Sequence, residues 1–400
     1  MAALDRRPTG PDASPGRRGR SRWRCLWLSA AAATAVLAGC SSGDGSQPTE
    51  PAATSDTAEA SQPEADGSAQ TAQPEPSTGD PATAVPTTDG PTTAGPDGAG
   101  GGQPTCRQIE VTTAGDVERL ELIETSGLVA GRADRGVLWA INDSGQEAGI
   151  YAIDETGRDL GFFALTGPDG PIATVDTEDL AMAGGQIHLA DIGDNGRRRP
   201  SVQIYLLDEP SVGGGPAPDG TVNPSSIITA TYPDGPTDAE ALLADPVTGE
   251  LLILSKDGDD GDAPTRLYAV PPQVDGGRES VETELVGMLD VAALTARSSR
   301  FSIAGLIFPG AVTGADISED GRTIALRTYG SVWLFPRLDG QTMAEALTGN
   351  EPCEGGTDSE PQGETVAFLP TGQDGSLRYA TISEGNNPPV NVVAVELANP

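Results

Sequence analysis

The chain has 400 residues, of which 24 are basic and 59 acidic, so its formal net charge is −35. Such a surface repels the phosphates of nucleic acids, and the composition therefore excludes nucleic acid as a partner. The acidity favours divalent cations or basic partners, with simple solubility as the alternative use of the carboxylates.

The first 39 residues have the features of a secretory signal peptide. Arginines at positions 17, 18, 20, 22 and 24 precede an apolar run from Cys25 to Gly39. That run is too short for a comfortable permanent membrane helix and suits the apolar region of a signal. No later segment has the run of about 18 apolar residues that a membrane span needs.

Cys40 directly follows Leu37, Ala38 and Gly39. This order resembles the lipobox of bacterial lipoproteins, in which the cysteine thiol takes a diacylglycerol and becomes the mature N-terminus. The alternative is an ordinary cleaved signal with an incidental cysteine. Because two acyl chains hold a protein firmly to a membrane, the sequence predicts lipidation of Cys40 and a protein anchored to the outer face of the cell membrane.

Residues 40–105 are predicted to be a disordered linker. They consist almost entirely of small, polar and acidic residues and proline, and Val85 is the only large aliphatic residue among them. Such a segment cannot bury enough apolar surface to offset its chain entropy.

Two cysteines remain, Cys106 and Cys353. Outside the cytoplasm an even pair of this kind predicts a disulfide bond. A zinc site would need more ligands than two cysteines and His188, the only histidine, can supply.

Residues 106–400 change in character, because short runs of Val, Ile and Leu with single aromatic residues alternate with Gly, Asp, Pro and Asn. Strand and turn signals recur throughout, and the segment Met343 to Leu347 is too short to predict a helix. The runs repeat in a common order, which is typical of a repeat architecture.

Each repeat has a polar step into apolar residues, a second run after a turn, and a third run at its end. The first runs are Ser126-Gly127-Leu128, Glu178-Asp179-Leu180, Glu240-Ala241-Leu242, Ala315-Asp316-Ile317 and Glu364-Thr365-Val366. The second runs are VLWAINDS at 137, IHLADIGDN at 187, LLILSKDG at 251, TIALRTYG at 323 and RYATISEG at 378. The third runs are IYAID at 150, QIYLLDE at 203, RLYAVPP at 266, SVWLFPR at 331 and VNVVAVEL at 390, and outer fourth strands are expected at GFFALTG (161), IITATYP (227) and ETELVGMLDV (282).

Four strands per unit, at spacings of about 50 to 75 residues, predict an all-β fold, a β-propeller with five countable four-stranded blades. The interval 291–313 leaves open a sixth blade or an insertion. The N-terminal run VERLELIE at 117 is expected to supply the outer strand of the last blade and close the ring, with Cys106 and Cys353 near that closure. A β-sandwich or a β-helix is the alternative fold.

Several motifs of 106–400 resemble a family of secreted and lipoprotein β-propellers of high-GC Gram-positive bacteria. They are SGL at 126, LWAINDSG at 138, DTED at 176, DIGDN at 191, DAEALLADPVTGELLILSKD at 238, GADISEDGRTIALRTY at 314 and the pair QGE and SEG at 362 and 383. The chain is also distantly similar to propellers with esterase-like phytase activity. Thr177 departs from the pattern, since an aromatic residue is usual there. The resemblance implies the fold and an extracytoplasmic location more than an activity.

Inner strands line the central channel of a propeller, so equivalent positions of successive blades meet around one mouth. Polar residues recur at the ends of the expected strands. The first-strand set is Glu124, Glu178, Asp179, Glu240, Asp316 and Glu364, and the second-strand set is Asn142, Asp143, Asp191, Asp194, Asn195, Lys256, Arg327 and Glu384.

Three interpretations of this polar ring remain open. It binds Ca²⁺ through carboxylate oxygens, and the candidate ligands are Glu178, Asp179, Asp191, Glu240, Asp316 and Glu364. Alternatively, two carboxylates and a cation hydrolyse an ester or phosphoester, with Glu178, Glu240, Lys256 and Arg327 as the candidates. In the third interpretation these residues make turn hydrogen bonds and salt bridges between blades.

The sequence therefore predicts a membrane-anchored, extracytoplasmic binding or scaffolding module. Its acidic mouth is expected to bind a small molecule, a glycan or a peptide, with Ca²⁺ as the one candidate cofactor. A metal-assisted esterase or phosphoesterase of the phytase-like kind is the alternative function.

Overall fold

The computed structural model describes residues 105–213, 219–257, 263–271, 278–300 and 302–398. The predicted signal peptide (1–39), the lipidated Cys40 and the linker up to residue 104 lie outside the described residues. Thr105, which we assigned to the linker, begins the first strand.

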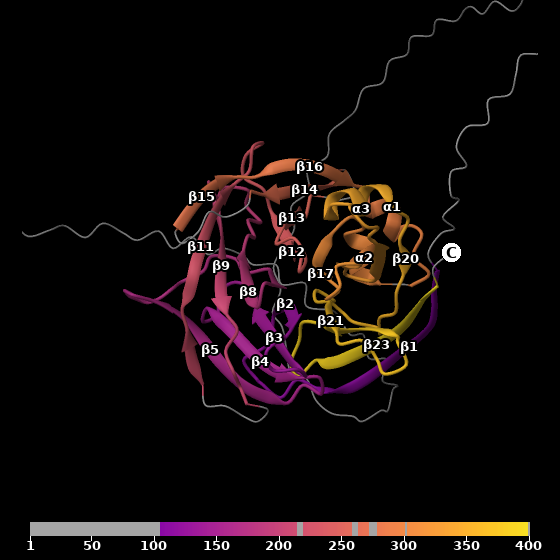
Figure 1. Ribbon diagram of the computed structural model, residues 1–400, viewed down its shortest axis with the longest axis horizontal. Helices are drawn as coiled ribbons and strands as arrows, with labels where there is room; N and C mark the ends of the chain where they lie inside the picture. Colours follow the sequence, from indigo (N-terminus) through magenta and orange to yellow (C-terminus); the bar gives the residue numbers. More distant parts are fainter. Residues whose placement is uncertain (1–104, 214–218, 258–262, 272–277, 301, 399–400) are drawn as a thin grey trace, which may run out of the picture. The chain divides into compact units, whose positions relative to one another are not determined.

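The described residues form a five-bladed β-propeller, as the sequence predicts (Figure 1). The four main strands of each blade form an antiparallel sheet, and in blades 1 to 4 they run in chain order from the hub outwards. Blade 1 contains β2 (Thr125–Ala130), β3 (Val137–Asn142), β4 (Gly149–Asp154) and β5 (Asp159–Gly167). Blade 2 contains β7 (Asp179–Ala183), β8 (Gln186–Asp191), β9 (Val202–Asp208) and β11 (Pro224–Thr231). Blade 3 contains β12 (Ala239–Ala244), β13 (Leu251–Ser255), β14 (Thr265–Val270) and β16 (Glu284–Leu289).

The last two blades are completed differently at their outer edges. Blade 4 contains β17 (Val312–Ile317), β18 (Thr323–Thr328), β19 (Val332–Pro336) and the two-residue β20 (Cys353–Glu354). Blade 5 contains β21 (Ala367–Leu369), β22 (Leu377–Ile382), β23 (Pro389–Ala398) and, on its outside, β1 (Thr105–Asp116).

Short extra strands cover two of the exposed outer edges. The strand β10 (Gly220–Val222) pairs in parallel with β5, and β15 (Arg278–Glu282) pairs in parallel with β11. The hairpin partner β6 (Gly170–Pro171) extends β5. In both parallel pairs the added strand comes from the chain segment of the following blade, so blade 2 covers the outer edge of blade 1 and blade 3 that of blade 2.

The hydrophobic core lies in the wedges between blades. The five buried clusters of the described residues each draw side chains from two adjacent blades. The inner strands contact one another in order, β2, β7, β12, β17 and β21, and β21 contacts β2 again. Matching inner-strand positions from distant parts of the chain therefore meet at one hub.

The ring is closed by the N-terminal strand, but this strand precedes the run at 117 that we expected. β1 pairs antiparallel with β23, from Thr105 opposite Ala398 to Asp116 opposite Pro389. Residues 117–124 form no ladder, because the amides of Val117 and Glu118 donate to different segments, Pro388 and Gly157. Val117 is instead buried where blade 5 meets blade 1.

The predicted disulfide between Cys106 and Cys353 is confirmed, with a Cα–Cα distance of 5.6 Å. It joins β1 of blade 5 to β20 of blade 4, at the closure of the ring. The two residues are 247 positions apart. Closing so long a loop stabilises a fold by about 5 kcal/mol in the chain-entropy treatment.

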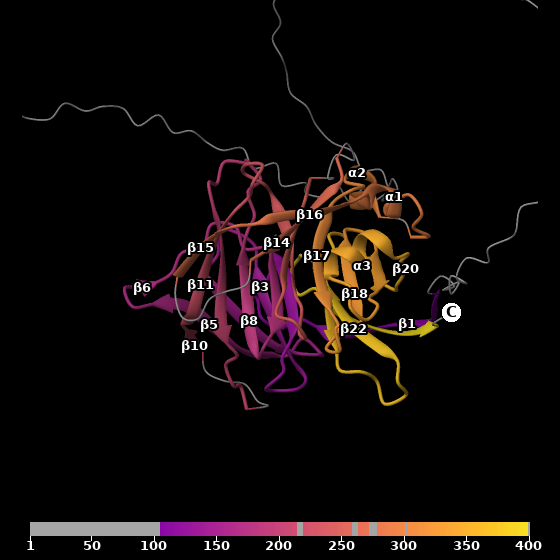
Figure 2. The same cartoon turned by 45° about the horizontal axis from the view of Figure 1, so that its top comes forward.

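The interval 291–313 is an insertion and not a sixth blade. It contains two short helices, α1 (Val291–Thr295) and α2 (Ile303–Ile307), which lie together at the top of Figure 2. A third helix, α3 (Met343–Gly349), occupies a segment that we judged too short to be helical. Its N-terminus carries a capping box between Thr342 and Glu345, and Met343 and Leu347 are buried in the core between blades 3 and 4.

In the part of the chain that the structure describes, no helix has both the length and the apolar character to cross a membrane.

Candidate functional site

Polar side chains gather at the end of the propeller where the inner strands begin, which we call the mouth face. Three inner strands are irregular at this point, with register shifts at Ser126–Gly127 in β2, Glu240 in β12 and Thr313 in β17. Bulges of this kind turn a side chain out of the regular alternation of a strand. The sequence therefore aims these residues at the hub.

Two glycines allow the inner strands to approach closely. A Cβ on Gly127 would lie 2.7 Å from the Leu180 nitrogen, and one on Gly314 would lie 2.5 Å from the Glu364 carbonyl oxygen. Beside them, the Ser126 hydroxyl donates to the Glu178 carbonyl at 2.7 Å, and the Thr313 hydroxyl donates to the Gly363 carbonyl at 3.0 Å. Ser126 of blade 1 thus holds the backbone at Glu178 of blade 2, and Thr313 of blade 4 holds the backbone next to Glu364 of blade 5.

The densest cluster at the mouth contains Asp143, Asp176 and Glu178, which we call the triad. One carboxylate oxygen of each lies within 4.8 Å of the others, an arrangement that could hold a metal ion. Asp143 follows β3 of blade 1, whereas Asp176 and Glu178 precede β7 of blade 2. In an extended chain, positions i and i+2 point to the same side, so the segment Asp176–Glu178 presents both carboxylates together.

Neighbouring residues hold the triad in place. The Asp191 carboxylate accepts hydrogen bonds from the amides of Val175 and Asp176 and pairs with Arg199 at 2.8 Å. The Thr177 hydroxyl donates to the Asn142 carbonyl of blade 1 at 2.8 Å. A Cβ on Gly193 would lie 2.1 Å from a Glu178 carboxylate oxygen, which explains the glycine of DIGDN.

Asp176 and Glu178 of the triad resist ionisation in the absence of a cation. Burial raises the pKa of Asp176 to about 7, and the charge of Asp143 adds to this shift. Burial also raises the pKa of Glu178 well above its usual value, followed by the charges of Glu240 and Asp143. The side chain of Asp176 shares a hydrogen bond with the Asp143 carboxyl group. It bonds to no basic group of the described residues. A bound cation would replace the protons that these groups otherwise retain.

The other side of the mouth combines further carboxylates with one lysine. The Lys256 ammonium lies 2.6 Å from the Glu240 carboxylate and 5.7 Å from the centre of the Tyr329 ring. Burial alone would lower the pKa of Lys256, but the charge of Glu240 raises it well above its usual value. Burial raises the pKa of Glu240 to about 7 although Lys256 opposes the shift.

Glu364 and Glu384 of blade 5 form a second carboxyl pair. They share a hydrogen bond with each other, and burial raises the pKa of both; the hydrogen bond adds to this shift at Glu364 and opposes it at Glu384. Glu364 is buried, whereas Glu384 is only partly buried. The charge of Asp143 also acts on Glu384, so the second pair and the triad belong to one acidic mouth.

Three of the six predicted metal ligands are engaged by backbone amides. Asp179 accepts hydrogen bonds from Leu180, Leu242 and Ala315, and thereby joins blades 2, 3 and 4. Asp316 accepts from Ile317 and from Phe368 of blade 5. Asp191 holds the triad loop, as described above. Glu178, Glu240 and Glu364 are the predicted ligands whose side chains meet at the mouth.

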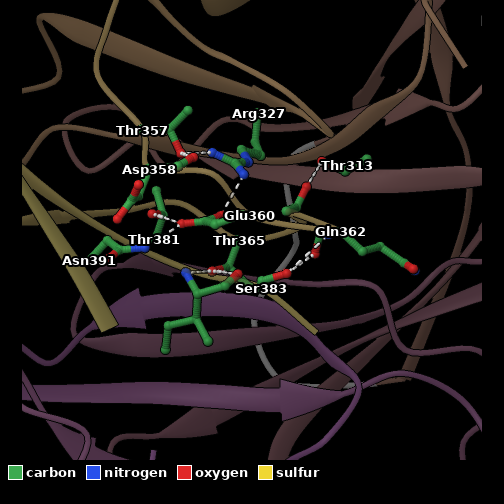
Figure 3. Close-up of polar contacts among 12 residues, drawn as sticks. Thr313, Arg327, Thr357, Asp358, Glu360, Gln362, Thr365, Thr381, Ser383 and Asn391 are labelled. Carbon is green, nitrogen blue, oxygen red and sulfur yellow. Dashed lines mark hydrogen bonds and ion pairs between the residues drawn. The ribbon is translucent and has the colours of Figure 1, made fainter. Parts of the chain in front are cut away.

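Of the four catalytic candidates, Arg327 is separated from the others. It is fully buried in the wedge between blades 4 and 5, where it donates to Thr357 at 2.9 Å and pairs with Glu360 at 2.6 Å (Figure 3). Glu360 also accepts hydrogen bonds from Thr381 and Asn391. Arg327 therefore holds two blades together, and Glu178, Glu240 and Lys256 remain as candidates.

Two residues of the mouth escaped the sequence-based sets, Asp176 and Tyr329. Asp176 belongs to the DTED motif and precedes Glu178 by two positions, a signal that was available from the sequence. Tyr329 follows β18 as Lys256 follows β13, since Thr328 pairs with Val312 and Ser255 pairs with Ala239. Only the register of these strands makes the two positions equivalent.

Comparison of the sequence with protein-family models and with curated proteins gave no match. Among solved structures, the iodide structure of a Trichoderma reesei protein of Carbohydrate-Active Enzymes Family AA12 is similar to this chain, with a TM-score of 0.35 and 12% sequence identity. The match covers 75% of this chain and 99% of that chain.

Proposed function

We propose that this chain is an exported lipoprotein, anchored through Cys40 to the outer face of the cell membrane, whose propeller is a binding module with a Ca²⁺ site at the mouth. The anchor and the location are supported by the sequence of residues 1–40. The Ca²⁺ site is supported by one observation above all, the convergence of Asp143, Asp176 and Glu178 from two blades.

The chemistry of the triad favours Ca²⁺ over other metals. It offers carboxylates without histidine or thiolate, a set that suits hard cations. Ca²⁺ takes six to eight oxygen ligands, and three carboxylates can supply up to about six of them, whereas Mg²⁺ usually keeps several waters. The raised pKa values of Asp176 and Glu178 fit a site whose negative charge is balanced by a ligand.

Calorimetric titration of the purified full-length protein with CaCl₂ tests the metal site. We expect saturable binding that Asp176→Asn weakens by about 100-fold, because a charged ligand is lost. The matched control is Asp339→Asn, which removes an exposed carboxylate on the opposite face of the propeller and should leave the affinity unchanged. Absence of Ca²⁺ binding at neutral pH would refute the site.

Membrane fractionation tests the anchor separately. Cys40→Ser should release the protein from the membrane fraction into the medium, because it removes the thiol that would carry the lipid. Continued retention of the variant would contradict lipidation without bearing on the metal site.

A metal-assisted esterase or phosphoesterase is the second candidate. It is favoured by the pKa of about 7 at Asp176 and Glu240, close to the best value for general acid–base catalysis at neutral pH. Lys256 could stabilise developing negative charge beside Glu240. Turnover of p-nitrophenyl acetate or p-nitrophenyl phosphate that requires Ca²⁺ and disappears in Glu240→Gln, but persists in Asp339→Asn, would favour the enzyme.

A further inference from the structure

The short helix α2 exposes its apolar residues to solvent. Ile303, Leu306 and Ile307 are 68%, 71% and 59% exposed, and the following Phe308 is 41% exposed. Their spacing of three and four places Ile303, Leu306 and Ile307 on one side of the helix. A helix on a globular domain normally turns such a side towards the core. We call these four residues the apolar rim.

The opposite side of α2 is fitted closely to blade 4. Gly305 is the only residue buried within the helix, and the hydroxyl of Ser302 caps it by accepting from the Gly305 amide. A Cβ on Gly330 would lie 2.7 Å from the Ser302 Cβ, so only glycine allows this approach. Gly330 follows β18 at the mouth face. Small residues thus hold α2 over the mouth end of blade 4 with the rim facing outwards.

Aromatic rings connect the rim to the acidic mouth. The ring of Phe308 lies 5.7 Å from that of Tyr329, and Tyr329 lies against Lys256. The charge of Glu364 also acts on Tyr329, and the Glu364 carbonyl packs against Gly314 in the inner strand of the same blade 4, so the Glu364–Glu384 pair occupies the next position around the mouth. The exposed rim is therefore connected, through Phe308 and the buried ring of Tyr329, to the part of the mouth that holds Glu364 and Glu384, to which no basic side chain of the described residues bonds.

We propose that the apolar rim and the Glu364–Glu384 pair together bind a peptide that carries an arginine or lysine next to apolar residues. The basic group of the peptide binds the carboxyl pair, and its apolar side chains pack on Leu306, Ile307 and Phe308. The inference rests on the proposed binding function of the mouth, but it uses residues outside the triad.

Charge and shape select this class of ligand. A guanidinium or ammonium group can form charge-assisted hydrogen bonds with both Glu364 and Glu384. An anionic lipid surface is opposed by the acidic mouth. Contiguous exposed apolar side chains typically mark interaction surfaces, and charged groups beside them set partner choice and orientation.

Screening a random octapeptide library on beads with labelled full-length protein, in the presence of Ca²⁺, tests the ligand class. We expect the enriched peptides to carry Arg or Lys within a few positions of Leu, Ile or Phe. No enrichment, or enrichment of acidic or uncharged polar peptides, would overturn the inference.

Fluorescence anisotropy with one enriched peptide then tests the surface. Leu306→Ser and Glu384→Gln should each raise the Kd by about tenfold, a typical loss for a contact residue at the centre of an interface. The control is Leu338→Ser, which changes a leucine of similar exposure, 62%, on the opposite face. Equal affinities of the Leu306→Ser and Leu338→Ser variants would remove the rim from the site.

Two further measurements separate the alternatives. Leu306→Ser should keep the Ca²⁺ affinity of the wild type, so loss of Ca²⁺ binding at the triad and loss of peptide binding at the rim are distinguishable failures. Sedimentation velocity and vesicle flotation complete the test. If Leu306→Ser only abolishes self-association, or only abolishes binding to phosphatidylglycerol vesicles, the rim serves another copy of the chain or a lipid surface and the peptide inference is wrong.

Discussion

Two regions of this propeller bury charged side chains, and they balance the charges in opposite ways. In the wedge between blades 4 and 5, Arg327 faces Glu360, whose remaining acceptor sites are filled by Thr381 and Asn391. At the mouth, six carboxylates gather, and Lys256 is the one basic group of the described residues that bonds to any of them. The six are Asp143, Asp176, Glu178, Glu240, Glu364 and Glu384.

The difference shows how a structural cluster is distinguished from a binding site when residue types are the same. A buried charge that serves the fold has a counter-charge and a full set of hydrogen bonds. The wedge supplies the counter-charge and most of these hydrogen bonds within the protein, and only the Nε of Arg327 lacks a partner among the described residues. At the mouth, Lys256 is the only basic partner that the described residues supply to these carboxyl groups, and several of them hydrogen-bond to one another instead. This is the pattern expected where a ligand supplies the missing positive charge.

The largest expected effect is in the wedge. Arg327→Met should lower the free energy of unfolding by about 3–5 kcal/mol, because it leaves Glu360 buried without its counter-charge. Urea denaturation followed by tryptophan fluorescence measures the loss. The double variant Arg327→Met with Glu360→Gln should recover part of it, and Ca²⁺ binding should persist in the folded fraction. A loss below about 1 kcal/mol would place this pair among weak surface ion pairs.

The fold was largely predictable because strand alternation and turn residues are local signals. Five repeats and three of the outer strands followed from them, whereas the disulfide followed from an even pair of cysteines outside the cytoplasm. Two local features were misjudged. The closing strand β1 lies just before the more apolar run at 117, and its partner β23 is at the other end of the chain. The helix α3 was missed because its capping box, Thr342 and Glu345, was given less weight than its short apolar run.

The site was less predictable because it depends on register. The sequence placed Arg327 with Lys256 at the ends of second strands. The pairing of Ser255 with Ala239 and of Thr328 with Val312 instead makes Tyr329 the equivalent of Lys256. Arg327 then corresponds to the core residue Leu254. The two assignments differ by two residues, roughly 7 Å along the strand, and this difference separates a residue of the mouth from a residue of the wedge.

The second prediction concerns the pH dependence of the mouth. Five of its carboxyl groups have higher pKa values in the folded than in the unfolded chain: Asp176 and Glu240, which reach about 7, and Glu178, Glu364 and Glu384. Such groups stabilise the fold fully below the unfolded pKa, near 4, and this contribution is lost as pH rises through 7. Without metal, we expect the Tm to be several degrees higher at pH 6.5 than at pH 8.

The pH window isolates the carboxyl groups of the mouth. Burial lowers the pKa of His188 to about 4, so this residue destabilises the fold only as pH falls below its ordinary value of about 6.5. At pH 8, Ca²⁺ should raise the Tm, since it binds the folded chain, and the gain should be smaller at pH 5.5, where protons compete. Differential scanning calorimetry measures both. A Tm that is equal at pH 6.5 and 8 without metal would contradict the charge imbalance of the mouth.

The smallest expected effect comes from comparing two single substitutions, Asp176→Asn at the mouth and Glu360→Gln in the wedge, by their change in the free energy of unfolding. At pH 8 without metal, Asp176→Asn should raise the free energy of unfolding by about 1 kcal/mol, because it removes one of several mutually repelling carboxylates. Glu360→Gln should lower it, because it removes the counter-charge of Arg327. With saturating Ca²⁺ the order at the mouth should reverse, and the wild type should become more stable than Asp176→Asn by the binding energy that the variant has lost. Thermal denaturation measures the stability of the wild type and of Asp176→Asn, each with and without Ca²⁺, and that of metal-free Glu360→Gln. If Asp176→Asn destabilises the metal-free protein as Glu360→Gln does, Asp176 is a structural residue. A carboxylate that serves as a metal ligand should instead lower the free energy of unfolding when the metal is absent, because nothing balances its charge.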